Sequence, residues 1–158
     1  MTVSIEVEDE AWAALPDLEG LTQSAVGAVL AAENKGIELD CEVAVLFTND
    51  AAIADINSEW RGKDKPTNVL SFPTAADMPV PKGEPKPLGD IVLAFGVISC
   101  EAAEQGKTLR AHTTHLIVHG MLHLLGHDHE DEAEAETMEG LETLILKGLG
   151  ISDPYERQ

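Results

Sequence analysis

The chain reads His119-Gly120-Met121-Leu122-His123-Leu124-Leu125-Gly126-His127-Asp128-His129, and all six of its histidines lie between positions 112 and 129. His119 and His123 are four residues apart, so in a helix they occupy the same face one turn from each other. Two imidazoles placed in this way are typical of a metal site. The stretch therefore predicts a histidine helix at the centre of the fold.

Gly126 can end the helix and turn the chain back toward His119 and His123. A glycine three residues after His123 can adopt the left-handed conformation that ends a helix. The chain then turns, and His129 can reach the two helical imidazoles from outside the helix. Three imidazoles suit Zn²⁺ and leave its fourth position open, which is the pattern of a catalytic zinc. The sequence thus predicts one zinc ion per chain, held by His119, His123 and His129.

The spacing His-x-x-x-His-x-x-Gly-x-x-His is that of the metzincin proteases, with one difference. In those proteases a glutamate follows the first histidine and acts as the general base. Gly120 occupies that position in this chain. The arrangement of the ligands is kept, whereas the peptidase base is missing.

Two stretches together resemble the YbeY family of metal-dependent endoribonucleases, also called rRNA maturation factors. Residues 114–129 read Thr-His-Leu-Ile-Val-His-Gly-Met-Leu-His-Leu-Leu-Gly-His-Asp-His. Residues 57–73 read Asn-Ser-Glu-Trp-Arg-Gly-Lys-Asp-Lys-Pro-Thr-Asn-Val-Leu-Ser-Phe-Pro. Asn68 stands where many members have aspartate, and His127 where many have tyrosine. Neither position is one of the three expected ligands.

The resemblance implies a single-strand-specific endoribonuclease that acts in rRNA maturation and ribosome assembly. It makes Arg61 the best catalytic candidate outside the metal site, because a guanidinium binds phosphate at two points and stabilises added negative charge. Without the resemblance, capping the carboxyl end of a helix would be the simpler role for Arg61. His115 is the second catalytic candidate; it can line the site, hold a phosphate or anchor a ligand.

Two other functions remain open from the sequence. One is a zincin-like peptidase whose base comes from elsewhere, with Glu130 as a candidate. The other is a ribosome-assembly factor with a structural metal, for which His127 would be the fourth ligand. The coordination number separates these possibilities, because three histidines and a water favour catalysis whereas four protein ligands favour a structural ion.

The composition is that of one compact domain over residues 1–158. A chain of 158 residues buries roughly two thirds of its unfolded surface without a disulfide. Cys41 and Cys100 are far apart and are expected to be reduced thiols. The N-terminus lacks the pattern of a secretory leader, and no apolar run reaches the length of a membrane span. We expect a cytoplasmic protein without membrane contact.

The net charge of −19 disfavours strong, sequence-independent binding to nucleic acid, which needs clustered Lys and Arg. However, seven of the ten basic residues fall between positions 61 and 110, and seven acids fall between 130 and 142. We therefore expect single-stranded RNA to bind weakly. The small ribosomal subunit or an assembly protein would present the RNA, with the acidic helix from Glu132 as a docking surface. The oligomeric state stays open.

The hydrophobic pattern predicts four strands and five helices. The helix after the second strand begins at Thr48 or Asn49 and should turn Ile53, Ile56 and Trp60 inward. Residues 73–88 hold five of the eight prolines and are expected to form an exposed loop. Residues 153–158 are expected to fray. The strands are predicted at 3–7, 42–48, 68–72 and 90–95, and the helices at 21–35, from 48 or 49 to about 60, 97–105, 108–125 and 132–147.

These elements predict an α+β fold. Two helical crossovers should make the first three strands parallel, because such connections return the chain in the same direction. The proline-rich loop contains no helix, so the fourth strand should run antiparallel. The expected fold is a small four-stranded mixed sheet, with three parallel strands and one antiparallel strand, packed helices and the histidine helix at the centre.

Overall fold

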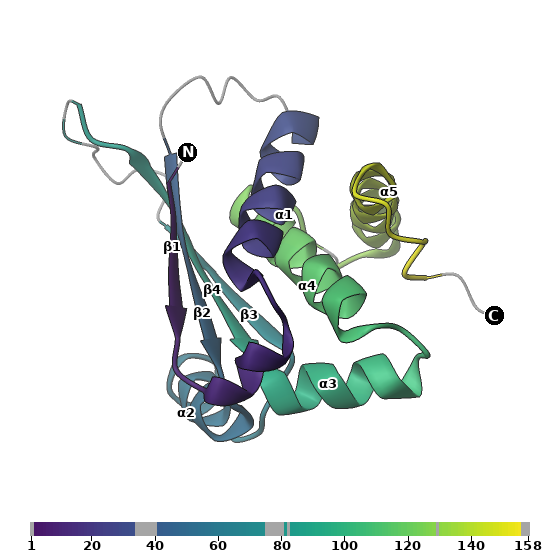
Figure 1. Cartoon of the computed structure of the whole chain (residues 1–158). Helices are drawn as coiled ribbons and strands as arrows, with labels where there is room; N and C mark the ends of the chain where they lie inside the picture. Colours follow the sequence, from purple (N-terminus) through teal and green to yellow (C-terminus); the bar gives the residue numbers. More distant parts are fainter. Residues whose placement is uncertain (1, 34–40, 75–80, 82, 129, 156–158) are drawn as a thin grey trace.

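The computed structural model of the chain describes residues 2–33, 41–74, 81, 83–128 and 130–155, and Figure 1 shows the elements that they form. The strands are β1 (Thr2–Val7), β2 (Cys41–Thr48), β3 (Val69–Pro73) and β4 (Lys86–Ala94). A short 3-10 helix, η1 (Glu10–Ala14), follows β1. The α-helices are α1 (Leu18–Glu33), α2 (Asp50–Arg61), α3 (Phe95–Glu104), α4 (Leu109–Leu124) and α5 (Glu132–Gly148).

The four strands form one mixed sheet in the order β1-β2-β4-β3. β1, β2 and β4 are parallel, and β3 is antiparallel to β4. The predicted α+β fold with three parallel strands and one antiparallel strand is confirmed. The prediction that the fourth strand is the antiparallel one is wrong, because that strand is β3. Helix α2 lies at the end of the sheet where β2 ends, so β3 starts from that same end and returns (Figure 1).

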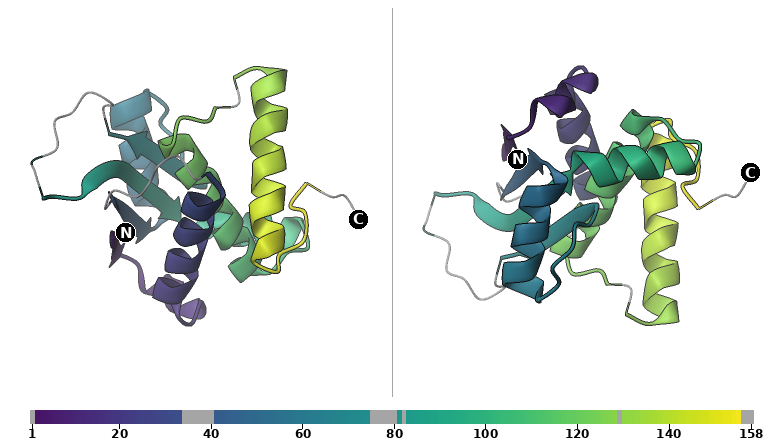
Figure 2. Two further views of the ribbon diagram at one scale, coloured as in Figure 1. Left: turned by 90° about the horizontal axis from the view of Figure 1, so that it is seen from above. Right: turned by 90° about the horizontal axis from the view of Figure 1, so that it is seen from below.

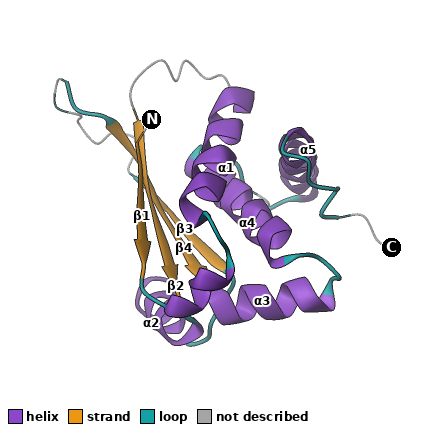
Figure 3. Cartoon of the chain, viewed as in Figure 1, coloured by secondary structure: helices purple, strands orange, loops and turns teal. Residues whose placement is uncertain are grey.

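Helices α1 and α4 cover one face of the sheet, and α5 lies on the outer side of α4 (Figures 2 and 3). The opposite face carries α2, which packs Ile53 against a small cluster formed by Leu70, Val92 and Ala94. The histidine helix α4 is thus sandwiched between the sheet, α1 and α5. Eleven of its sixteen residues are buried.

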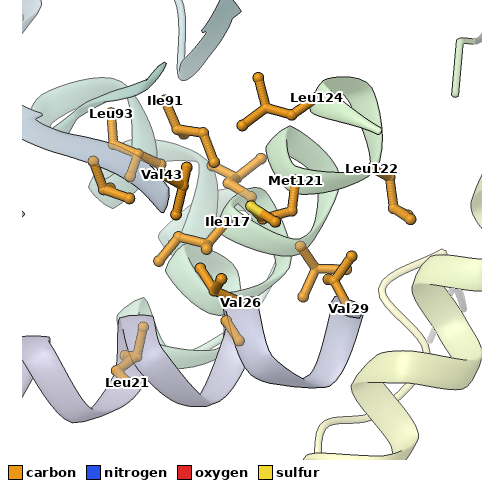
Figure 4. Close-up of a cluster of buried hydrophobic side chains, with 14 of the residues drawn as sticks. Leu21, Val26, Val29, Val43, Ile91, Leu93, Ile117, Met121, Leu122 and Leu124 are labelled. Carbon is orange, nitrogen blue, oxygen red and sulfur yellow. The ribbon is translucent and has the colours of Figure 1, made fainter. Parts of the chain in front are cut away.

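The main core lies between the sheet and the two covering helices (Figure 4). Val26 and Val29 of α1 meet Ile117 and Met121 of α4, and Leu93 of β4 completes the layer. All five side chains are inaccessible to solvent. Burying an aliphatic side chain of this size contributes about 1.5–3 kcal/mol relative to leaving it in water. Core packing therefore fixes α4 against the sheet.

Gly120 allows α4 to lie close to the sheet. A Cβ atom at this position would be 3.1 Å from both Ile91 Cγ2 and Ser71 Oγ. The residue that replaces the protease glutamate is therefore a close-contact point between α4 and the strands β3 and β4. The structure leaves no room there for a longer side chain.

Several predicted details are wrong. Trp60 does not point inward, since 69% of its surface is exposed. Residues 153–155 do not fray, because Lys107 Nζ donates a hydrogen bond of 2.8 Å to the Pro154 carbonyl. Helix α1 begins at Leu18 rather than at residue 21. The connection between β3 and β4 is shorter at both ends than the loop predicted at 73–88, because β3 continues to Pro73 and β4 starts at Lys86.

The remaining predicted boundaries agree with the structure to within a few residues. The predicted end of the first helix at Lys35, parts of the proline-rich loop at 75–80 and 82, and residues 156–158 of the segment expected to fray lie outside the described residues. Within the described part of the chain, no helix has the length and apolar character needed to cross a membrane.

The Gly120 contact gives a prediction about stability. Gly120→Leu should lower the free energy of unfolding by about 1–3 kcal/mol, because the added side chain meets Ile91 and Ser71 in a packed interior. Gly140→Leu is the matched control on α5, where a Cβ would meet nothing within 4 Å. It should leave stability unchanged or slightly higher, since Leu favours a helix over Gly. Urea unfolding of the two variants measures the difference, and equal stability would contradict the close contact.

Candidate metal centre

Helix α4 begins and ends at defined caps that set the histidine positions. The Thr108 side chain accepts a hydrogen bond from the Ala111 backbone N–H. At the other end Gly126 adopts φ +100°, and the backbone N–H of His127 donates to the Leu122 carbonyl over 3.0 Å. The predicted left-handed turn at Gly126 is confirmed. His129, the third predicted ligand, lies outside the described residues.

His119 and His123 bring their imidazoles together as the spacing predicts. The two Nε2 atoms are 3.1 Å apart, and the ring centroids are separated by 4.6 Å. Each Nδ1 atom has a different partner. His119 Nδ1 lies 2.7 Å from Glu142 Oε1, and His123 Nδ1 lies 3.0 Å from the His127 carbonyl oxygen.

These partners determine where the imidazole protons lie. A backbone carbonyl only accepts hydrogen bonds, so His123 Nδ1 must donate. An ionised carboxylate also only accepts, so His119 Nδ1 donates to Glu142. In the neutral imidazoles both Nε2 lone pairs then face each other at 3.1 Å. A cation bound by both nitrogens would suit this arrangement.

The pair fits a soft or borderline cation such as Zn²⁺. Neutral imidazole nitrogens are good zinc ligands, and ligating histidines usually donate their second N–H to a carboxylate or carbonyl, as His119 and His123 do here. Among the residues that the structure describes, no group of three His, Cys, Asp or Glu side chains is placed to hold a metal ion. Two of the three predicted ligands, His119 and His123, lie in the described part of the chain, and their Nε2 atoms converge.

Glu142 is a site residue that the sequence reasoning missed. It lies on α5, is inaccessible to solvent and accepts hydrogen bonds from three side chains. His119 and His115 donate to Oε1, over 2.7 and 3.1 Å, and Tyr155 donates to Oε2 over 2.6 Å. The signal in the sequence was a glutamate on the same face of α5 as the buried Met138 and Ile145.

The hydrogen bonds keep Glu142 ionised. Burial alone would raise the pKa of its carboxyl group, but the hydrogen bonds from His115, His119 and Tyr155 outweigh burial and lower the pKa to about 2. Burial and the hydrogen bond to Glu142 raise the pKa of the Tyr155 phenol, so this hydroxyl stays protonated and donates. A negative charge is thus fixed behind His119.

His115 lies one helical turn before His119, on the side of Glu142. Its side chain is 10% exposed, and its Nε2 donates to Glu142. Its Nδ1 is buried, with no hydrogen-bond partner in the described part of the protein. The neutral imidazole with its proton on Nε2 satisfies this environment, because a buried unpaired N–H is more costly than an unpaired lone pair. This geometry suits anchoring a ligand better than contacting RNA.

The other two described histidines bind glutamates from different elements. His112 Nε2 lies 2.9 Å from Glu101 Oε1 on α3, as expected for a structural residue on another face. His127 Nε2 contacts Glu33 at the end of α1. This contact engages the Nε2 atom of His127 with an element other than α4.

Arg61 lies at the exposed end of α2, beside the edge strand β3. Its Nη2 donates to the Ser71 carbonyl over 3.3 Å, and its guanidinium carbon is 5.9 Å from the centre of the Phe72 ring. Ser71 Oγ in turn faces Gly120, the neighbour of His119. Arg61 and the histidine pair are therefore linked through one strand, without a direct contact.

An apolar groove of about 480 Å³ lies on the face of the sheet that carries α2. Trp60 and Phe72 line it, with their ring centroids 6.2 Å apart, and Asp90 lies at its wall. Arg61, Lys63 and Lys65 next to Trp60 are all exposed. Lys107, which the sequence grouped with them, instead binds the Pro154 carbonyl. Arg61, Lys63 and Lys65 thus form a small group of exposed cations beside an exposed aromatic ring.

Comparison with known families gives one match over most of the chain. A family profile described as Endoribonuclease YbeY matches residues 5–150. This range contains α4, the Arg61 segment and Glu142, whereas Tyr155 lies beyond it.

Individual relatives match over nearly their full length. A protein named Endoribonuclease YbeY from Azorhizobium caulinodans is 48% identical over 156 residues, which cover 98% of this chain and 96% of the relative. A protein of the same name from Chelativorans sp. is 52% identical, over 98% of this chain and 93% of the relative. A solution structure from Thermotoga maritima is similar in fold, with a TM-score of 0.59, 23% identity and coverage of 99% of this chain and 100% of that one.

The ionisation of Glu142 gives a prediction about pH. Its pKa is lowered from 4.5 to about 2, so the ionised group stabilises the fold fully above the unfolded value and loses this contribution as pH falls toward the folded value. In metal-free protein, the excess stability of the wild type over Glu142→Gln should shrink by about 2 kcal/mol between about pH 5 and about pH 3, and the rest of the contribution is lost only as the pH falls through the folded value. Urea unfolding from about pH 5 to about pH 3 measures the difference. A difference that is constant with pH would contradict the assignment.

Proposed function

This chain belongs to the YbeY endoribonuclease family, and we propose on that premise that it cleaves single-stranded RNA with one zinc ion during rRNA maturation. Endoribonuclease activity is supported by the family match over residues 5–150 and by 48% and 52% identity to proteins of that name. The convergence of the His119 and His123 Nε2 atoms at 3.1 Å carries the proposal of a metal centre.

Three residues would hold the ion in this proposal, namely His119, His123 and His129. When bound, zinc supplies Lewis acidity, which polarises a phosphoryl oxygen and acidifies a water. The chain contributes the orientation of the ligands. Glu142 and the His127 carbonyl bind the Nδ1 protons, so each described ligand presents the Nε2 lone pair.

Arg61 would hold the phosphodiester. Its guanidinium carries five donors, and the Ser71 carbonyl accepts one hydrogen bond from Nη2. The other donors can bind phosphate oxygens and stabilise the additional charge of the transition state. Position supports this role, since Arg61 is exposed at the strand that packs beside His119.

Two observations speak against the alternatives. A glutamate at position 120 would clash with Ile91 and Ser71, which speaks against a peptidase base at the metzincin position on this helix and leaves Glu130 as the only base proposed for that alternative. The His127 imidazole contacts Glu33, which supports three protein ligands and an open coordination position rather than a structural site with four.

Trp60 supports single-stranded RNA as the substrate. Its ring is 69% exposed and adjoins both Arg61 and the apolar groove. Exposed aromatic rings stack on unpaired bases, which a duplex does not offer. A base on Trp60 would place its phosphate within reach of the cations at positions 61–65.

The acidic surface supports delivery of the RNA by a partner. With a net charge of −19 and three exposed cations beside Trp60, the protein can neutralise few phosphates, so its affinity for naked RNA should be low. The exposed acids of α5 suit a basic surface, as the small ribosomal subunit or an assembly protein would provide. These acids are Glu132, Glu134, Glu136 and Glu139.

The ligand assignment predicts the effect of removing each imidazole. Alanine at His119, His123 or His129 should abolish the binding of one zinc per chain and remove the rise in melting temperature that zinc gives the wild type, because metal binds the folded state. Metal analysis after dialysis, with thermal unfolding, measures both effects. His127→Ala is the control and should keep its zinc. Full zinc content in His129→Ala would refute the third ligand, and zinc loss in His127→Ala would favour a four-ligand site.

The proposed role of Arg61 predicts a loss of catalysis without a loss of metal. Arg61→Ala should lower kcat/KM on a single-stranded RNA oligonucleotide by on the order of 100-fold, with zinc content and melting temperature unchanged. Lys63→Ala is the control and should have a small effect that disappears with added salt. His119→Ala purified in parallel measures contaminating nuclease. Wild-type activity in Arg61→Ala, or loss of its zinc, would refute the role.

A further inference from the structure

The C-terminal turn at Asp153–Tyr155 folds back onto the helices of the metal centre. Lys107, just before α4, donates to the Pro154 carbonyl over 2.8 Å. Asp153 Oδ1 accepts a hydrogen bond of 2.8 Å from the Tyr155 backbone N–H. It also lies 3.3 Å from the Thr143 hydroxyl of α5, whose proton is shared with the Glu139 carbonyl at 2.9 Å. The Lys107 bond holds the turn at the start of α4, and the Thr143 contact places it beside the middle of α5.

The turn carries the Tyr155 side chain to the buried carboxylate. The phenol ring meets His115 edge-on, with centroids 5.5 Å apart and the planes at 87°. Its hydroxyl donates to Glu142 Oε2 over 2.6 Å. Although Tyr155 is 43% exposed, Glu142 is inaccessible to solvent. A surface residue therefore reaches a charged group in the interior.

The two oxygens of Glu142 accept hydrogen bonds from different donors. Oε1 accepts from His119 and His115, and Oε2 accepts from Tyr155. A carboxylate is planar, so donors at both oxygens fix the rotation of the group. Loss of the phenol hydroxyl would leave Oε2 without this donor and would allow the carboxylate to turn, and the geometry at His119 Nδ1 would change with it.

We propose that Tyr155 is a positioning residue for metal binding, which acts through Glu142 to hold the His119 imidazole with its proton on Nδ1 and its lone pair on Nε2. This inference rests on the proposed function, because it takes His119 as a metal ligand. It extends the metal centre to the C-terminal turn, 26 residues beyond the last histidine.

A second histidine–glutamate pair on α4 provides a matched control. His112 binds Glu101 over 2.9 Å, as His119 binds Glu142 over 2.7 Å. Both histidines belong to α4, and both glutamates belong to neighbouring helices. The Glu101 pair does not include a predicted ligand. Glu101→Gln therefore removes a comparable interaction without touching the proposed path.

Zinc affinity, measured by competition with a chromogenic chelator, tests the proposal. Tyr155→Phe keeps the ring against His115 and removes only the hydroxyl, and it should weaken zinc binding about 10-fold. Glu142→Gln should weaken it by about 10- to 100-fold, whereas Glu101→Gln should bind zinc as the wild type does. Because Tyr155 acts through Glu142, Tyr155→Phe added to Glu142→Gln should cause little further loss. Fully additive losses, or wild-type affinity in Tyr155→Phe, would overturn the proposal.

The tautomer of His119 gives a readout that needs no metal. Nitrogen-15 NMR of the metal-free wild type should assign the His119 proton to Nδ1, and Tyr155→Phe should shift this proton partly to Nε2, while His112 stays unchanged. A wild-type His119 signal in Tyr155→Phe would overturn the inference even if the melting temperature of the variant had fallen.

If the wild type itself bound no zinc, the proposed metal centre would fail together with this inference. Zinc binding that is unchanged in Tyr155→Phe would overturn the inference alone.

Discussion

Helix α4 is enclosed by the sheet, α1 and α5, and this enclosure forces every described imidazole on it to find a partner inside the protein. A polar group that leaves water without a hydrogen bond destabilises the fold by about 1–3 kcal/mol. His112 meets Glu101, and both His115 and His119 meet Glu142. Near the end of the helix, His123 uses the backbone carbonyl of His127. The orientation of these imidazoles follows from the positions of their hydrogen-bond acceptors.

The hydrogen-bond acceptors of His119 and His123 orient the two imidazoles so that their Nε2 atoms converge. Acceptors lie at Nδ1 of both His119 and His123, so the Nε2 atoms meet at 3.1 Å. The acceptor for His119 is Glu142 of α5, a helix that lies on the side of α4 away from the sheet (Figure 1). Helix α5 thus contributes to the proposed metal centre as well as to the core.

The sequence predicted what depends on neighbouring residues. The helix predicted over 108–125, which spans Leu109–Leu124 in the structure, the turn at Gly126 and the meeting of His119 with His123 all follow from local sequence patterns and spacings. The direction of β3 and the exposure of Trp60 were predicted wrongly. Both depend on where α2 lies relative to the sheet, and a helical period does not specify whether a helix runs along a sheet or across its end.

The sequence by itself determined the fold class, the family and the pairing of His119 with His123, because an i, i+4 pair is fixed by the geometry of one helix. Tertiary structure alone decided which groups stand behind and beside that pair. Glu142 lies 23 residues after His119, and Tyr155 lies 13 residues after Glu142. Arg61 reaches the histidine helix only through the strand that packs against Gly120. Contacts between separate elements depend on how their faces pack, and local spacing carries no record of that packing.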